Sequence, residues 1–265
     1  MSTRNRFAVL VLAAVAMTVA CGGGEKEETK APPPAAGGAP AAPGAGAAAP
    51  AATAGNATIS GKITFTGTVP PAEKVKLSAD PKCVEMHKEG MEKQPIKVKD
   101  GGLADVYVYV KGGLPPGNYP APAEPAVIDQ KGCNYTPHIV TLQVGQPLKI
   151  KNDDDTLHNI HPRPTINEEF NIGQPRKGME STRTFTKKEI MFPVGCDVHP
   201  WMRAYISVAD NPFYAVTKED GTFEIKGLPA GDYEIEAYHE KLKTMSQKVS
   251  VKSGETTKVD FAFKG

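Results

Sequence analysis

The stretch that decides the fold is Val140-Thr141-Leu142-Gln143-Val144-Gly145-Gln146-Pro147-Leu148-Lys149-Ile150. Apolar residues occupy alternate positions on both sides of the Gly145–Pro147 segment, where glycine and proline favour a turn. A period of two places these apolar side chains on one face of a β-strand. The stretch therefore predicts two half-buried strands connected by a turn.

The same period recurs on both sides of this stretch. Toward the amino terminus, 59–65 alternates, and 96–110 is typical of a hairpin around Asp100-Gly101-Gly102. Toward the carboxyl terminus we expect strands near 182–186, 190–194, 204–208, 213–217, 223–225, 233–237, 249–251 and 259–263. One short helix is expected, with Asp80 as its N-cap, Pro81 in its first position and its end near Gly90. Because no long helical period appears, we predict an all-β chain built from sandwiches.

The amino-terminal segment is typical of an export signal. Arg4 and Arg6 precede the apolar stretch 7–20, which is too short to span a bilayer. Its end, Thr18-Val19-Ala20-Cys21, resembles the lipobox of bacterial lipoproteins, in which the cysteine is acylated. We expect 1–21 to be a lipoprotein signal with Cys21 lipidated, and the folded part to lie outside the cytoplasm on a bacterial membrane, facing the periplasm or cell surface. An ordinary cleaved signal is the alternative.

Residues 22–55 are rich in Ala, Pro and Gly and cannot bury a core, so we expect a disordered tether. The formal net charge of the chain is +1, which gives no electrostatic argument for nucleic acid as a partner.

Three kinds of metal-binding side chain fall in one loop between two expected strands. Cys196 supplies a thiolate, His199 an imidazole and Met202 a thioether, while His158 follows an earlier strand and offers a second imidazole. A thiolate with two imidazoles and a weak axial thioether is the donor set of blue-copper electron-transfer sites. The sequence therefore predicts one copper ion as the cofactor.

These segments resemble the cupredoxins, and the amicyanins in particular. The loop 196–202 has the same Cys-x-x-His-Pro-aromatic-Met pattern, 158–161 has a similar His-Asn-aliphatic-His pattern, and the likeness covers about 126–210. The resemblance implies a Greek-key sandwich over 126–210 with one mononuclear copper site. By resemblance, the ligands are His158, Cys196, His199 and Met202. It also implies three neighbouring roles: an Asn159 bond near the Cys196 sulfur, an exposed His199 edge as the electron port, and an apolar rim of Pro200 and Trp201 for an unidentified redox protein.

The segment 211–265 resembles the carboxypeptidase regulatory-like domain. Asp220–Phe223 and Gly227–Tyr233 carry the likeness. It implies a smaller transthyretin-like sandwich, often grouped with carbohydrate-binding-like folds, and such a fold hosts many functions. These domains usually begin with a strand resembling 59–64. Residues 56–125 therefore form either a separate amino-terminal β segment, or one whose first strand joins the tail domain around an inserted copper domain.

Cys83 and Cys133 remain after the other two cysteines are assigned. In an exported protein two such cysteines indicate a disulfide. The alternative is a soft-metal patch of Cys83, Met86, His87 and Met91 that would suit Cu(I).

Other polar residues favour structural roles. We expect His161 to lie on the surface at the rim of the copper site, His138 and His239 to be packed structural residues, and 153–155 to be a solvated turn. No nucleophile and base share a motif, so we expect no enzyme activity.

Three functions compete. The first is an electron carrier. The second is a binding module, in which exposed tail aromatics such as Tyr214 or Tyr238 recognise a glycan or another partner, and the copper domain is structural or empty. The third is copper storage or delivery.

Overall fold

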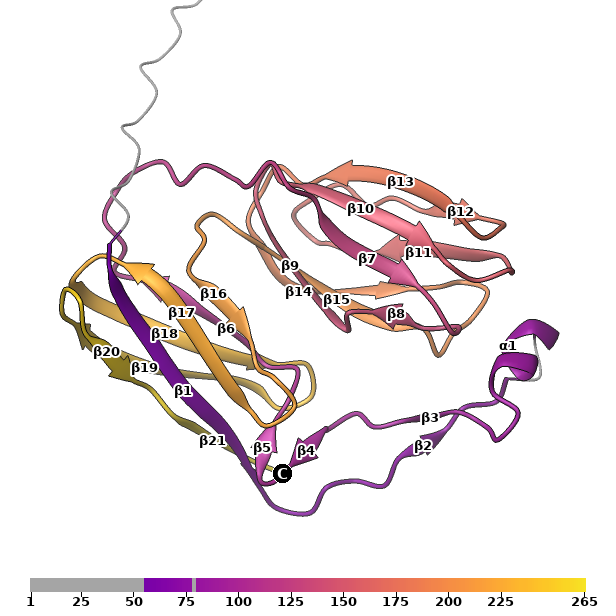
Figure 1. Ribbon diagram of the computed structural model, residues 1–265, viewed down its shortest axis with the longest axis horizontal. Helices are drawn as coiled ribbons and strands as arrows, with labels where there is room; N and C mark the ends of the chain where they lie inside the picture. The colour runs from indigo at the N-terminus through magenta and orange to yellow at the C-terminus, as the bar shows by residue number, and fades with distance from the viewer. Residues whose placement is uncertain (1–54, 78–79) are drawn as a thin grey trace, which may run out of the picture. The chain divides into compact units, whose positions relative to one another are not determined.

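The computed structural model describes residues 55–77 and 80–265 (Figure 1). The expected signal, the lipidated Cys21 and nearly all of the expected tether lie outside these ranges. Within them the regular structure is almost entirely β, with a single short helix, and the all-β prediction is confirmed. No helix in the described ranges is long and apolar enough to cross a membrane.

The strands of the first and last parts of the chain form one sandwich, here called the terminal sandwich. One sheet has the order β17-β1-β5-β4, with β20 and β21 also paired to β1, and the other has the order β16-β6-β18-β19. The bounds are β1 Ala57–Thr66, β4 Val98–Lys99, β5 Gly102–Leu103, β6 Tyr107–Gly112, β16 Tyr214–Val216, β17 Thr222–Leu228, β18 Gly231–His239, β19 Lys243–Val251, β20 Thr256–Lys258 and β21 Phe261–Lys264.

Strand β1 is the strand whose ownership the sequence left open. It pairs antiparallel with β17 and parallel with β20 and β21, so it belongs to the terminal sandwich. Its alternating residues Ile59, Ile63 and Phe65 are buried in the core. Gly61 stands in the same row because a Cβ there would lie 1.7 Å from the backbone oxygen of Val259. The glycine is therefore required by the close approach of a neighbouring strand.

The hairpin expected over 96–110 is wrong in extent. Only β4 and β5 pair around the turn at Asp100 and Gly101, whereas β6 crosses to the opposite sheet and pairs with β16 and β18. Val108 and Val110 face the shared core from that second sheet. A period of two specifies which face of a strand is buried but not which strand it pairs with.

The strands between β6 and β16 form a second sandwich, the central sandwich. Its sheets have the orders β13-β10-β7-β8 and β12-β11-β14-β15-β9. The bounds are β7 Ala126–Gln130, β8 Tyr135–Thr136, β9 Ile139–Gln143, β10 Pro147–Asn152, β11 His158–Pro162, β12 Ile172–Gln174, β13 Met179–Thr184, β14 Glu189–Gly195 and β15 Arg203–Ala209. The alternating stretch 140–150 supplies β9 to one sheet and β10 to the other, so both strands bury their apolar residues in the same core.

A third part, the strap, comprises 67–77 and 80–97 between β1 and β4. It contains β2 (Glu73–Lys74) paired with β3 (Glu92–Lys93), and the helix α1 (Pro81–Met86). Asp80 caps α1 by accepting a hydrogen bond from the Lys82 backbone N–H at 2.7 Å, which confirms the predicted helix start. The helix ends at Met86, earlier than the expected end near Gly90.

Candidate metal centre

Three of the predicted metal-binding side chains converge in the core of the central sandwich. His158 begins β11, while Cys196 and His199 lie in the loop between β14 and β15. The two Nδ1 atoms are 2.9 Å apart, and the Cys196 Sγ lies 3.7 Å from the Nδ1 of His199. One donor atom from each of the three residues falls within 4.8 Å of the others. The three side chains therefore surround a single point.

The loop is held in a tight turn by its own backbone. The Met202 N–H donates to the His199 carbonyl at 2.8 Å, and the Cys196 N–H donates to the Met202 carbonyl at 3.3 Å. Met202 is fully buried in the same core cluster as Cys196. The turn therefore keeps the thioether residue beside the thiolate and the imidazole.

Each imidazole is bound to a carboxylate at its far nitrogen. His158 Nε2 donates to Asp154 at 2.9 Å, and His199 Nε2 donates to Asp80 at 2.9 Å. A carboxylate at Nε2 keeps a proton on that nitrogen, so Nδ1 is the nitrogen that would bind a metal ion after losing any proton it carries. The two Nδ1 atoms and the Cys196 sulfur lie close together, so a metal ion would be bound at the point between them.

Asp154 lies in a nest of donors. Its oxygens accept the backbone N–H groups of Cys133 at 2.7 Å and Gly132 at 2.8 Å in addition to His158. Burial alone would raise the pKa of Asp154, but the bond from His158 and the two backbone N–H groups outweigh it and lower this pKa. The residue is therefore a carboxylate in a buried position.

The pKa values of the Cys196 thiol and the His158 imidazole shift in opposite directions. Burial opposes ionisation of Cys196, but bonds from His158 and His199 outweigh it and lower the pKa of the thiol to about 6. Burial also disfavours the imidazolium of His158, but Asp154 and Cys196 raise its pKa to about 9. The thiolate, the form that binds metal, is favoured near neutral pH.

Asn159 fixes the loop around the sulfur. Its Oδ1 accepts the Asp197 N–H at 2.8 Å and lies 3.2 Å from the Cys196 Sγ. Its Nδ2 donates to Asn171 at 2.8 Å and to the Asp197 carboxylate at 3.0 Å. Asn159 thus lies beside the sulfur, where the resemblance implied it would be.

The prediction that one edge of the His199 ring is exposed is wrong. His199 is 0% exposed, because the Asp80 carboxylate covers Nε2 and the Trp201 ring centroid lies 5.0 Å from the imidazole centroid. Trp201 is half-buried, and its Nε1 donates to the Cys133 carbonyl at 3.1 Å. Pro200 is exposed. The expected apolar rim is therefore only partly open.

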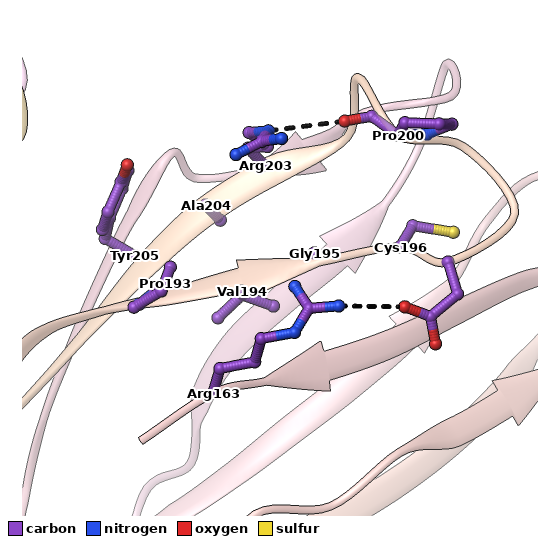
Figure 2. A pocket seen from close by; sticks show the side chains of 10 residues that line it. Arg163, Pro193, Val194, Gly195, Cys196, Pro200, Arg203, Ala204 and Tyr205 are labelled. Atoms are coloured by element: carbon purple, nitrogen blue, oxygen red, sulfur yellow. Dashed lines mark hydrogen bonds and ion pairs between the residues drawn. The ribbon is translucent and has the colours of Figure 1, made fainter. Parts of the chain in front are cut away.

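A small cavity lies on the outer side of the loop. It measures about 230 Å³ and lies among Arg163, Pro193, Tyr205 and the backbone around Gly195. Figure 2 shows the Cys196 side chain pointing away from Arg163 and Tyr205, and Arg163 paired with Asp197 (3.1 Å). Cys196 is one of the residues that line this cavity, whereas His158 and His199 are not.

Residues 199–264 match the family model of the carboxypeptidase regulatory-like domain. Strands β16–β21 of the terminal sandwich lie within this match, and the sandwich is called the regulatory-like domain below. The match begins before β15, and the regulatory-like domain is completed by β1 and β4–β6 from far upstream.

Part of the chain is similar to solved copper proteins. A purple cupredoxin from Nitrosopumilus maritimus is 22% identical over 32% of this chain and 99% of its own, with a TM-score of 0.28. A Cu(I) amicyanin variant is 24% identical over 31% of this chain and 79% of its own, with a TM-score of 0.28. A copper-containing nitrite reductase from Thermus scotoductus is 19% identical over 37% of this chain and 25% of the reductase, also with a TM-score of 0.28. The curated proteins contain no match to the sequence.

Cys83 and Cys133 form a disulfide with a Cα–Cα distance of 5.8 Å. The alternative soft-metal patch is not assembled, because Cys83 is in the disulfide, Met86 is exposed and His87 Nε2 bonds the Gly132 carbonyl at 2.8 Å. The disulfide instead joins α1 to the loop that holds Asp154.

The other polar residues divide between surface and core. His161 is bonded to Asp197 and Glu169 at the surface beside the site. His138 lies 3.5 Å from Glu240, and His239 is 1% exposed and accepts the Lys241 N–H. These positions agree with the expected rim and structural roles.

Sequence analysis missed two residues of the site. The solvated turn expected at 153–155 is wrong for Asp154, which is 4% exposed and bonded to His158. Asp80 was expected only as a helix cap, and it also bonds His199. The spacing of Asp154 four residues before His158 is the one local signal available, and Asp80 carries none because it lies 119 residues from its partner.

Proposed function

We propose that the protein is an extracytoplasmic electron carrier whose central sandwich holds one copper ion. The observation that carries the proposal is the convergence of Cys196, His158 and His199 with both imidazoles bound at Nε2 by carboxylates. This donor set suits copper, and the carboxylates of Asp154 and Asp80 would hold the two imidazoles in place as metal ligands.

The chain's own residues would hold the ion with little rearrangement. His158, Cys196 and His199 would be the strong ligands, and Met202 would be the weak fourth one. Copper, when bound, supplies one-electron exchange between Cu(I) and Cu(II). Asp154 keeps His158 in place, and the tight turn keeps Met202 beside Cys196. Side chains fixed by packing and hydrogen bonds change position little when the charge at the centre changes.

An electron carrier fits this site better than an enzyme. The three converging residues are at most 4% exposed, so they offer little surface to a substrate. The sequence features of 4–21 support export and a lipid anchor at Cys21. A redox protein is the expected partner.

The two alternatives have less support. In the binding-module hypothesis, Tyr214 and Tyr238 would be exposed, but both are half-buried and pack against Tyr107, Ile139 and Met191. Copper storage or delivery would use the soft-metal patch around Cys83, but the Cys83 sulfur is in a disulfide and is not free to bind Cu(I). Neither alternative has a specific observation in its favour.

The test is copper loading of the full chain in detergent. One equivalent of Cu(II) should give an intense thiolate-to-copper absorption band and a stoichiometry of one ion per chain. Cys196→Ser should abolish the band, whereas His161→Ala, which removes a neighbouring histidine outside the donor set, should keep it. Absence of both band and retained copper in the unmodified chain would overturn the proposal, and more than one Cu(I) per chain would favour storage.

A further inference from the structure

The strap reaches from the regulatory-like domain to the metal centre and is fastened there. The disulfide joins Cys83 to Cys133, and the ring of His87 bonds the Gly132 carbonyl at 2.8 Å. A third tie runs from the Lys93 ammonium to the Asn134 side chain at 2.5 Å. All three attachments are on the loop 132–134, so the strap is fixed next to the site.

Asp80 is the strap residue that touches the site. One of its oxygens caps α1 through the Lys82 N–H, and the other accepts both the Thr156 hydroxyl at 2.7 Å and the Nε2 of His199 at 2.9 Å. Its side chain is 13% exposed, while that of His199 is fully buried. The same carboxylate thus starts the helix and covers the outer edge of the imidazole.

We propose that Asp80 is a positioning residue of the metal centre, and that the strap, latched by the Cys83–Cys133 disulfide, closes the His199 edge to other molecules. This inference rests on the proposed copper function. It assigns the strap a specific effect: electrons do not enter or leave through the His199 edge while the Cys83–Cys133 disulfide is intact.

The bond also has an electronic consequence. A carboxylate that accepts the Nε2 proton increases the electron donation of an imidazole, and tighter donation stabilises the more highly charged metal ion. Asp80 is therefore expected to stabilise Cu(II) over Cu(I) and to hold the reduction potential down. A cap that only starts a helix would have no such effect.

Asp80→Asn separates the two roles, because Asn is as good an N-cap as Asp but carries no charge. Glu85→Gln is the matched control, since Glu85 is an exposed carboxylate on the same helix that bonds no part of the site. With copper bound, the reduction potential should rise in Asp80→Asn and stay at the unmodified value in Glu85→Gln. Equal potentials in the two variants would overturn the positioning role.

The closure is tested on the metal-free full chain with diethylpyrocarbonate, which modifies accessible imidazoles, and mass spectrometry of each histidine. His199 should react at least tenfold more slowly than the partly exposed His161, and this protection should be lost in the double variant Cys83→Ser/Cys133→Ser. The circular dichroism spectrum and the Trp201 fluorescence should stay native in that variant. If they do not, reduction of the disulfide in the unmodified chain serves as the opening step.

Failure of this inference is distinguishable from failure of the copper function. If the chain binds no copper, the proposed function fails, and the reactivity of His199 still shows whether the edge is closed. If copper binds but His199 reacts as fast as His161 in the unmodified metal-free chain, the closure is refuted while the copper function stands.

Discussion

The replacement Asn159→Ala tests whether the loop around the sulfur is held as the structure indicates. Asn159 is 6% exposed and is the acceptor for the Asp197 backbone N–H. Its removal leaves that N–H without its partner and takes away two further bonds from Nδ2 to Asn171 and the Asp197 carboxylate.

The expected loss of unfolding free energy follows from these contacts. Leaving the partly buried Asp197 N–H without its partner costs about 1–3 kcal/mol. Each of the other two lost hydrogen bonds costs about 1 kcal/mol at most near the surface, so we expect a total of about 3 kcal/mol. With a urea m-value of about 2 kcal/mol/M, the midpoint should fall by about 1.5 M. Trp201 is the only tryptophan of the chain and lies beside His199, so its fluorescence reports this sandwich specifically.

The experiment uses metal-free protein, so the ion does not add to the stability difference. Asn171→Ala is the matched control. This exposed residue bonds the side chains of Asn159 and Asp197, and its loss should lower the unfolding free energy by less than about 1 kcal/mol. A loss below about 1 kcal/mol for Asn159→Ala, or equal losses in both variants, would refute the assignment of Asn159 as the main support of the loop.

Three other predictions concern stability. Glu189→Gln should cost about 3 kcal/mol of unfolding free energy at pH 7, because the buried carboxylate accepts three consecutive backbone N–H groups. Burial raises the pKa of Glu189, but these bonds lower it below the ordinary 4.5, so the stabilisation is present above that pH and is lost in acid. In urea titrations, the difference in unfolding free energy between the variant and the unmodified chain should disappear below about pH 4. A difference that persists at low pH would contradict this. Removing the disulfide by Cys83→Ala/Cys133→Ala should lower the unfolding free energy in urea by at most about 4 kcal/mol, since the bond closes a loop with a separation of 50 residues. A larger loss would show that the disulfide does more than restrict the unfolded chain. Gly61→Ala should destabilise the regulatory-like domain by about 3 kcal/mol, because the new Cβ would lie 1.7 Å from a backbone oxygen. Thermal unfolding followed by circular dichroism should show this loss, while the unfolding midpoint followed by Trp201 fluorescence stays unchanged. A shift of both midpoints would show that the two sandwiches unfold together.

Much of the fold was predictable because alternation is a local signal. Val140, Leu142, Leu148 and Ile150 all face the central core, and β1 buries the residues that its pattern selected. Strand pairing was less accessible, since it depends on long-range contacts. The same alternation in β6 is compatible with a hairpin to β4 and with the observed pairing to β18, and only the second buries Val108 and Val110 against the opposite sheet.

The donors were predictable for a different reason. Cys196, His199 and Met202 share one loop, so their chemistry is visible in seven consecutive residues, and a second histidine was the only missing part. The carboxylates that orient the imidazoles have no such proximity. Asp154 stands in a run of three aspartates that is typical of a solvated turn, and only the backbone N–H groups of 132 and 133 make its burial favourable.

The carboxylate of Asp80 connects the strap to the central sandwich. Asp80 belongs to an excursion between β1 and β4, two strands of the regulatory-like domain, yet its carboxylate ends on a residue of the central sandwich. A central sandwich alone, 126–209, would contain every predicted metal ligand but not the group that covers the Nε2 of His199. Under the proposed function, the central sandwich would supply the donors and the strap would determine how the bound ion is reached. A resemblance based on the loop 196–202 indicated the converging side chains, but it gave the wrong exposure for His199, because the covering carboxylate lies 119 residues away.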